Sequence, residues 1–248
     1  MLQPESLEDA YKMKITVIYG NMRHGSTWHC TQEILQQLMH LDVVEVTEFS
    51  LPRDLPQFCN GCFCCIYKGE ETCPHRSYTR PIEEALIAAD LIILASPVYG
   101  LDVSGAMKTL IDHLCFQWMS HRPHPAMFKK IGLTVTTSAG AGLGHTTKTL
   151  KNSLVFWGVQ NVVTFKYPVS AMKWDDVSAK NQAKIRRRAR TLASRIARVA
   201  KAPRRLRNPL FRSFFFSLMR GMQQKNDWNP LDRAHWEKLG WLSGHKPF

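Results

Sequence analysis

The sequence contains no long hydrophobic run. None of its apolar stretches reaches the roughly 18–20 residues that a membrane-spanning helix requires. The N-terminal segment MLQPESLEDAYKM is acidic and lacks the apolar core of a signal peptide. We therefore expect a cytoplasmic protein. The seven cysteines fit this expectation, because clustered thiols in a reducing compartment hold metal or perform redox chemistry more often than they form disulfides.

Acidic residues are scarce in the C-terminal quarter of the chain. Residues 180–248 contain 18 Lys/Arg against 3 Asp/Glu, whereas residues 1–179 contain 15 Lys/Arg against 17 Asp/Glu. The net charge of +13 is therefore confined to the tail, and it does not make nucleic acid an expected partner of the whole protein. The length of 248 residues and the hydrophobic content of 44% predict one substantial α/β domain with an appendage.

Two common phosphate-binding motifs are also missing from the first predicted strand-to-helix turn, residues 14–27 (KITVIYGNMRHGST). A nucleoside triphosphatase loop needs a lysine where Ser26 stands, and G-x-G-x-x-G needs a third glycine beside Gly20 and Gly25. What remains is a hydroxyl-rich loop suited to one terminal phosphate, because the first N–H groups of a helix carry positive partial charge. The alternative is an ordinary turn with Ser26 as the helix cap.

Hydrophobic patterning predicts five strands that alternate with helices. The crossovers are long enough for right-handed βαβ units, so we expect a parallel, doubly wound sheet. The predicted strands are residues 14–19, 43–49, 90–95, 130–137 and 159–167, and the predicted helices are residues 26–39, 80–89 (starting at Arg80 or Pro81), 104–119, 146–157 and 177–201.

Three loops follow the carboxyl ends of the first, third and fourth predicted strands, at residues 21–27, 96–100 and 137–142. Ligands of such sheets bind beyond these strand ends at the switch point, so we expect one shared pocket. The first loop offers phosphate donors. The second pairs Pro97 with Tyr99, and the third has no bulky side chain, so that a flat ring could lie against its backbone.

The order and spacing of these loops resemble the flavodoxin-like NAD(P)H-dependent FMN reductase family over roughly residues 14–167. The run Met107-Lys108-x-x-x-Asp112 also resembles the family helix after S-P-x-Y, whereas Met22, His24 and Trp28 depart from the family pattern. The resemblance implies a sheet order of 2-1-3-4-5 and FMN as cofactor. The residues that would bind it are Asn21, Arg23, Gly25, Ser26, Thr27, Ser96, Pro97, Val98, Tyr99, Gly100, Thr137, Ser138, Ala139 and Gly140.

The same resemblance implies an NAD(P)H oxidoreductase that passes electrons to a small acceptor such as a quinone or a nitroaromatic compound, and a homodimer or higher homo-oligomer. We assign no catalytic side chain, because hydride transfer depends on stacking geometry and the cofactor carries the chemistry. The first alternative is an FMN electron-transfer protein without its own substrate. A weaker alternative is a redox sensor that uses the cysteine loop.

The cysteine loop has the pattern Cys59-x2-Cys62-x2-Cys65-x7-Cys73-Pro74, with Cys64 inside the run. This spacing is similar to ferredoxin loops and to the iron-sulfur flavoprotein branch of the same family. The resemblance implies a 4Fe-4S cluster on Cys59, Cys62, Cys65 and Cys73. A loop of reduced thiols and a structural zinc site are the alternatives. We expect no ligand set among the histidines, and we interpret Cys30 and Cys115 as core thiols of helices.

The tail is predicted to be helical and basic. We divide the chain into an N-terminal arm (1–13), a flavodoxin-like domain (14–201) and a helical extension (202–248), with the amphipathic helix at 177–201 as the last helix of the sheet domain. Two further helices are expected to begin at Asn208-Pro209 and Asn229-Pro230. Their aromatic rings need a cover. We expect a partner subunit or the flavin pocket, with a membrane surface as the second option and RNA as the third.

Overall fold

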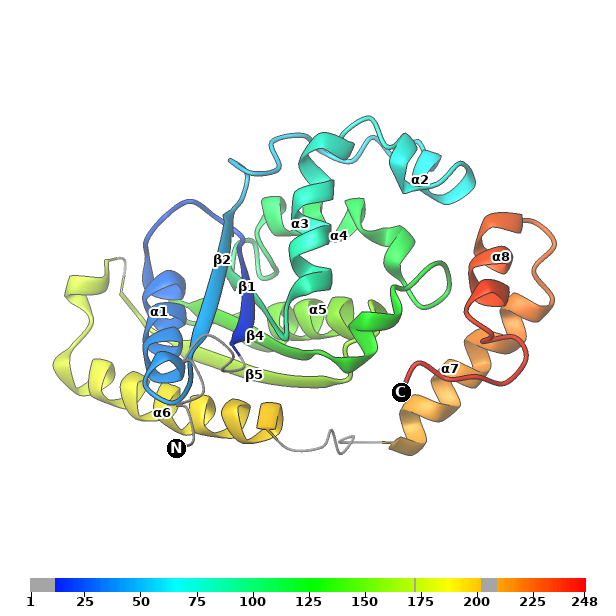
Figure 1. Ribbon diagram of the computed structural model, residues 1–248. Coiled ribbons are helices and arrows are strands. Elements are labelled where there is room, and N and C mark those ends of the chain that lie inside the picture. The colour runs from blue at the N-terminus through cyan, green and yellow to red at the C-terminus, as the bar shows by residue number, and fades with distance from the viewer. Residues whose placement is uncertain (1–11, 172, 202–208) are drawn as a thin grey trace, which may run out of the picture.

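A five-stranded parallel sheet forms the centre of the computed structural model, which describes residues 12–171, 173–201 and 209–248 (Figure 1). Its order is β2-β1-β3-β4-β5, so the predicted flavodoxin-like fold class is confirmed. Most of the predicted N-terminal arm and the start of the predicted extension lie outside the described residues. The strands are β1 (Met13–Tyr19), β2 (Val44–Ser50), β3 (Leu91–Pro97), β4 (Ile131–Ser138) and β5 (Asn161–Pro168).

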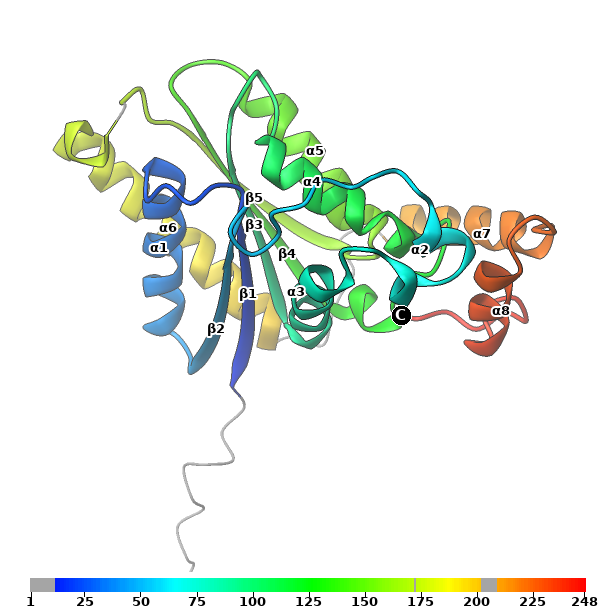
Figure 2. The same cartoon turned by 90° about the horizontal axis from the view of Figure 1, so that it is seen from above.

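Helices cover both faces of the sheet (Figures 1 and 2). On one face, α1 (Ser26–Met39) and α6 (Ala179–Lys201) share a core with alternate strand residues such as Val17 and Ile93. The opposite face carries α3 (Arg76–Ala88), α4 (Gly105–His113) and α5 (Leu143–Phe156), which pack on Ile18 and Ile92. Strand β3 is buried along nearly its whole length, as a parallel strand covered on both sides should be.

Helix α3 begins earlier than the sequence suggests. The predicted start was Arg80 or Pro81, because proline is favoured in the first helical turn. The helix instead begins at Arg76 and contains Pro81. Ion pairs of Arg76 with Glu71 and Glu83 hold this added first turn in place. The sequence pattern around Pro81 does not record these contacts, so it placed the start too late.

Helix α4 ends at His113, six residues before the predicted end at Met119. Leu114 leaves the helical conformation, and residues Cys115–Gln117 form a separate 3-10 turn. The break directs Cys115 toward Cys65, at an Sγ–Sγ distance of 4.0 Å. Cys115 packs against the core of this face as expected but is only half-buried and also lines the cysteine cavity, whereas Cys30 is fully buried.

Two smaller boundary errors occur at glycines. Helix α5 begins at Leu143 instead of residue 146, directly after Gly142, whose φ of +83° ends the preceding loop. Strand β5 begins at Asn161 instead of residue 159, because Gly158 turns the chain with φ +102°. Neither shift moves a predicted loop away from the carboxyl edge of the sheet.

The C-terminal extension packs on its own domain. Phe216 of α7 (Pro209–Gln224), Trp236 of α8 (Pro230–Lys238) and Trp241, just after α8, are buried against Met119 and Phe128. The expectation that a partner subunit or the flavin pocket covers these rings is wrong for this cluster. A second stripe on α7 stays exposed, at Phe214, Leu218 and Met222. No helix in the described part of the chain is both long and apolar enough to cross a membrane.

Candidate functional site

The three predicted loops meet in one pocket at the carboxyl edge of the sheet. The cavity has a volume of about 220 Å³. Parallel strands present all their carboxyl ends at the same edge, which is why segments more than a hundred residues apart converge here. The lining residues are Asn21, Arg23, Gly25, Ser26, Thr27, Pro97, Val98, Tyr99, Thr137, Ser138, Ala139, Val169 and Ala171.

Three predicted residues do not line this cavity. Ser96 is buried beneath it, where its hydroxyl accepts a bond from Ser104 N at 3.0 Å and donates to Pro97 O at 2.9 Å. Gly100 occupies a tight turn with φ +55°, and Gly140 lies in the third loop outside the lining set. Ser96 and Gly100 therefore support the second loop without facing the cavity.

Val169 and Ala171, which the sequence did not predict as site residues, also line the cavity, from the segment after β5. The signal was available, because β5 is parallel to β4 and its carboxyl end must reach the same edge. Pro168, at the end of that strand, marks where the chain leaves the sheet.

Hydrogen bonds join the loops to one another. The Thr27 and Thr137 hydroxyls are 2.7 Å apart and buried, which ties the first loop to the third. Asn21 Nδ2 donates to the Tyr99 hydroxyl at 3.0 Å, which ties the first loop to the second. The pocket is therefore held as one unit before any ligand binds.

Helix α1 presents an open N-terminus to this cavity. Its N-cap is Gly25, and no side chain accepts from the first N–H groups. The alternative in which Ser26 caps the helix is therefore wrong. These N–H groups have no intrahelical partner, so they can bind an anion such as a terminal phosphate.

A second polar feature also calls for a ligand. The Ser138 hydroxyl is buried at the cavity wall, and it has no hydrogen-bond partner among the described residues. A buried hydroxyl without a partner costs roughly 1–3 kcal/mol, so an occupant with a polar edge would stabilise this arrangement. The open helix end and the orphaned hydroxyl fit a ligand that combines a phosphate with a polar ring, as FMN does.

A second cavity, of about 310 Å³, lies at the cysteine loop. All four predicted metal residues line it, and Cys115 joins them from beyond α4. The chemistry of this donor set suits a soft metal centre, because thiolates are the ligands of iron-sulfur clusters. The lining residues are Cys59, Asn60, Gly61, Cys62, Phe63, Cys65, Cys73, Pro74, His75, Asp112, His113 and Cys115.

The thiols of this cavity influence one another. Cys65 can donate its S–H to Cys115, which lowers the pKa of Cys115 and raises that of Cys65. Burial raises the pKa of Cys73, and the neighbouring thiols Cys65, Cys62 and Cys59 raise it further. The loop therefore brings the four motif cysteines close enough to interact, although their sequence positions span the turn α2 (Cys64–Tyr67) and a 3-10 turn at Glu70–Thr72.

Two histidines stand beside the last cysteine of the motif. His75 Nδ1 and His113 Nε2 are 2.9 Å apart, and His113 Nδ1 donates to Thr109 O at 2.8 Å. Burial lowers the pKa of His113, which favours its neutral form. No ligand set among the histidines was expected from their spacing in the sequence. Only the fold brings His113, at the end of α4, to the Cys-x-His segment before α3.

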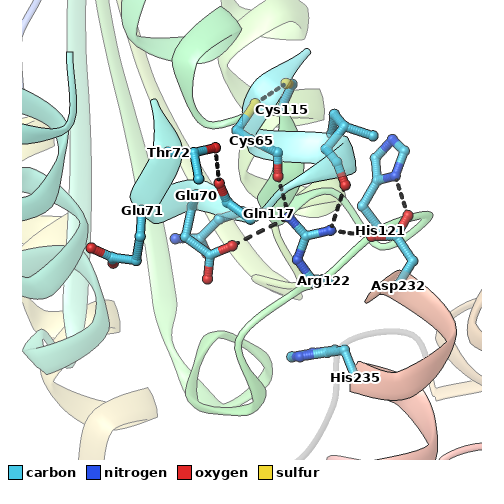
Figure 3. A network of polar contacts seen from close by, with 12 residues as sticks. Cys65, Glu70, Glu71, Thr72, Cys115, Gln117, His121, Arg122, Asp232 and His235 are labelled. Carbon is cyan, nitrogen blue, oxygen red and sulfur yellow. Dashed lines mark hydrogen bonds and ion pairs between the residues drawn. The ribbon is translucent and has the colours of Figure 1, made fainter. Parts of the chain in front are cut away.

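Arg122 fastens the cysteine loop to the C-terminal extension (Figure 3). Its guanidinium donates to the carbonyls of Cys65 and Ile66 and pairs with Asp232 of α8. Asp232 is fully buried and also accepts from His121 Nδ1 at 2.7 Å. Asn229 Nδ2 donates to Ile66 O at 3.1 Å, so α8 contacts the loop twice.

The fold and the first pocket together define a doubly wound α/β protein with a cavity at its switch point, next to the uncapped start of α1. A comparison with protein families matches residues 13–172 to the family described as NADPH-dependent FMN reductase. The chain therefore belongs to the NADPH-dependent FMN reductase family.

Individual relatives agree with this family. An iron-sulfur flavoprotein of Archaeoglobus fulgidus is 29% identical over 153 residues, which cover 59% of this chain and 64% of that protein. An iron-sulfur flavoprotein of Methanocaldococcus jannaschii is 37% identical over 100 residues, covering 40% of this chain and 50% of the relative. The chain thus spans less than two thirds of the length of these relatives.

A solved structure shares the fold. An FMN-dependent NADH-azoreductase of Bacillus anthracis, in complex with FMN, has a TM-score of 0.58 at 11% identity, and the alignment covers 75% of this chain and 99% of that one. At this identity the likeness concerns the fold alone.

Proposed function

We propose that the protein is an FMN-dependent NAD(P)H oxidoreductase that passes electrons to a small acceptor such as a quinone or a nitroaromatic compound. The observation that carries this proposal is the pocket in which the uncapped start of α1, the second loop and the buried Ser138 hydroxyl face one cavity. FMN bound there would supply the hydride- and electron-transfer chemistry that no side chain of the protein provides.

The chain's own residues bind and orient the ligand in this proposal. The first N–H groups of α1 and the Arg23 side chain hold the phosphate, because both place positive charge at the first loop. Pro97, Val98 and Tyr99 line the cavity where they would hold the ring, and the unpartnered Ser138 hydroxyl would be available to hydrogen-bond a polar edge of it. Val169 closes the cavity on the side of β5 and excludes water there.

The test is an anaerobic titration of the purified full chain. We expect it to bind FMN, to lose the oxidised-flavin absorbance on addition of NADPH or NADH, and to oxidise the nicotinamide continuously when a quinone is present. A protein that binds FMN and is reduced by dithionite but not by either nicotinamide would be the electron carrier instead. Absence of FMN binding would overturn both functions.

We further propose that the cysteine cavity holds a 4Fe-4S cluster on Cys59, Cys62, Cys65 and Cys73. The support is the convergence of these thiols on one cavity and the similarity to iron-sulfur flavoproteins. A cluster passes single electrons, which would connect the flavin to a one-electron partner. Anaerobic purification with iron and sulfide analysis is the test, and full flavin with negligible iron and sulfide would refute the cluster.

The remaining proposals concern the protein's surroundings. All seven cysteines are free thiols, which supports a reducing, cytoplasmic setting.

We propose a homodimer that buries the exposed α7 stripe of Phe214, Leu218 and Met222. Phe214→Asp with Leu218→Asp should then give a monomer in size-exclusion chromatography. Pelleting of the unmodified chain with anionic vesicles at low salt would favour the membrane alternative through the basic helix α6.

A further inference from the structure

The cysteine cavity contains a second donor set besides the four motif thiols. Cys73, His75 and His113 each offer one ligand atom, and these atoms all lie within 4.8 Å of one another. Two of the residues belong to the segment before α3 and the third ends α4, so the fold and not a sequence motif assembles the set. Ligand atoms around one tetrahedral metal ion lie roughly 3.3–3.8 Å apart, so small side-chain rotations would complete the site.

His113 already makes the hydrogen bond that a metal-ligating histidine makes with its other ring nitrogen. Its Nδ1–H donates to Thr109 O at 2.8 Å, which leaves the lone pair of Nε2 directed toward His75 Nδ1 at 2.9 Å. A ligating histidine nearly always donates its other ring N–H to a carbonyl or a carboxylate, because this bond fixes the tautomer and the ring direction. The Thr109 carbonyl performs that role within the helix itself.

The donor types select the class of ion. One thiolate and two imidazoles suit Zn²⁺ and similar divalent transition-metal ions, whereas Mg²⁺ and Ca²⁺ prefer oxygen ligands. Asp112 is the carboxylate that lines this cavity, and it is paired with Lys108 on the exposed side of α4. The set is therefore softer than an acidic cation site.

We propose that Cys73, His75 and His113 bind one divalent transition-metal ion, with Zn²⁺ as the best match, and that its fourth coordination position opens into the cavity. Binding releases the Cys73 thiol proton to solvent. The ring proton of His75 moves through water from its Nδ1 to its own Nε2, so that His75 Nδ1 becomes free to ligate. A cluster on the four motif cysteines also uses Cys73, so the ion and the cluster are alternative occupants of this cavity.

The experiment uses the full chain, reduced and stripped of metal with a chelator under anaerobic conditions, and titrates it with Co²⁺. We expect one equivalent to bind with the visible spectrum of a tetrahedral ion and a thiolate charge-transfer band, and Zn²⁺ to displace it. His75→Ala and His113→Ala should each weaken Co²⁺ binding at least tenfold, because each removes a ligand. His145→Ala, on an exposed histidine of α5, is the matched control and should bind Co²⁺ normally.

Variants of the motif separate the ion from the cluster. Cys59→Ser and Cys62→Ser should keep Co²⁺ binding and lose the iron and sulfide of a reconstituted cluster, whereas the two histidine variants should keep the cluster. FMN binding and circular dichroism verify folding, with His75→Gln and His113→Gln as substitutes if an alanine variant does not fold. The proposal is overturned if the histidine variants bind Co²⁺ as tightly as the unmodified chain, or if Cys59→Ser abolishes that binding.

Discussion

Arg122 and Asp232 form a buried ion pair between the segment after α4 and helix α8, and the same guanidinium holds the carbonyl of Cys65. The side chain of Asp232 is fully buried, and that of Arg122 is 8% exposed. Because both charges are removed from water, the pair is stable only while each partner and its hydrogen bonds are present. Through Arg122, the C-terminal extension is thus held directly against the cysteine loop.

Asp232→Ala should lower the free energy of unfolding by about 3–5 kcal/mol, because it leaves the Arg122 charge buried without its partner. Chemical denaturation followed by circular dichroism measures this change. The control is Arg233→Ala, at the residue next to Asp232. It breaks an exposed ion pair with Glu237 and should lower the free energy of unfolding by about 1 kcal/mol or less. Equal effects of the two variants would mean that the buried pair does not anchor α8.

Gly142→Ala should weaken FMN binding at least tenfold. Gly142 has φ +83°, and a Cβ there would lie 2.5 Å from Val98 Cγ1 and 3.2 Å from Leu101 Cα. The second loop would have to move, and with it the wall of the pocket. Fluorescence titration with FMN measures the loss. Gly144→Ala is the control, because a Cβ at Gly144 meets nothing within 4 Å. An unchanged FMN affinity of Gly142→Ala would show that the position of the second loop does not determine flavin binding.

Arg23→Ala should weaken the binding of FMN about ten- to a hundredfold, since a hydrogen bond to a charged group contributes about 1.5–3 kcal/mol. Riboflavin lacks the phosphate, so its affinity should change little. The ratio of the two dissociation constants is therefore the informative quantity. Arg53→Ala, at an exposed arginine paired with its neighbour Asp54, serves as the control. An equal loss for FMN and riboflavin would show that Arg23 does not contact the phosphate.

Stability should fall as the pH drops below about 6.5. Burial lowers the pKa of His235 from its ordinary value of 6.5, and burial also lowers that of His124. Below pH 6.5 these histidines take up protons in the unfolded chain but stay neutral in the folded chain. Acid therefore favours unfolding as the pH falls from 6.5 toward the lowered pKa of the folded state. Denaturation at pH 7.5 and 5.5 measures the difference between the two conditions.

His235→Gln tests the contribution of one residue to this pH dependence. Glutamine can still donate to Pro123 O, which His235 Nε2 contacts at 3.1 Å, but it does not titrate. The difference in unfolding free energy between pH 7.5 and 5.5 should therefore be smaller in this variant. An identical pH profile would assign the effect to other groups.

The periodic parts of the chain were the predictable ones. The order of strands and the meeting of three loops follow from chain topology, so residues such as Thr27 and Thr137 could be brought together without a structure. The start of α3 at Arg76 and the break before Cys115 could not, because ion pairs with Glu71 and Glu83 and a contact with Cys65 decide them. The Cys65–Cys115 contact joins residues 50 positions apart, and the two ion pairs of Arg76 depend on how the side chains meet, which hydrophobic periodicity does not record.

The donor set around His113 illustrates the same limit. His75 lies two residues after Cys73 and could have been noticed, but His113 is 38 residues further along the chain, and no sequence pattern joins it to that segment. The aromatic rings of the tail were correctly predicted to need a cover. Their actual cover, Met119 and Phe128 of the same chain, depends on how the extension folds back.

Helix α4 spans the interval between the two cavities. Its N-cap Ser104 donates to Gly20 O at 2.5 Å beneath the first loop, and its last residue, His113, lines the cysteine cavity. With a rise of about 1.5 Å per residue, the helix sets an axial separation of about 14 Å. One residue inserted into the helix would rotate His113 by about 100° about the helix axis, away from the cysteine cavity, while Ser104 stayed in place. The helix therefore fixes both the distance and the relative orientation of the two cavities. Its length can change only by whole turns if Ser104 and His113 are both to keep facing their cavities.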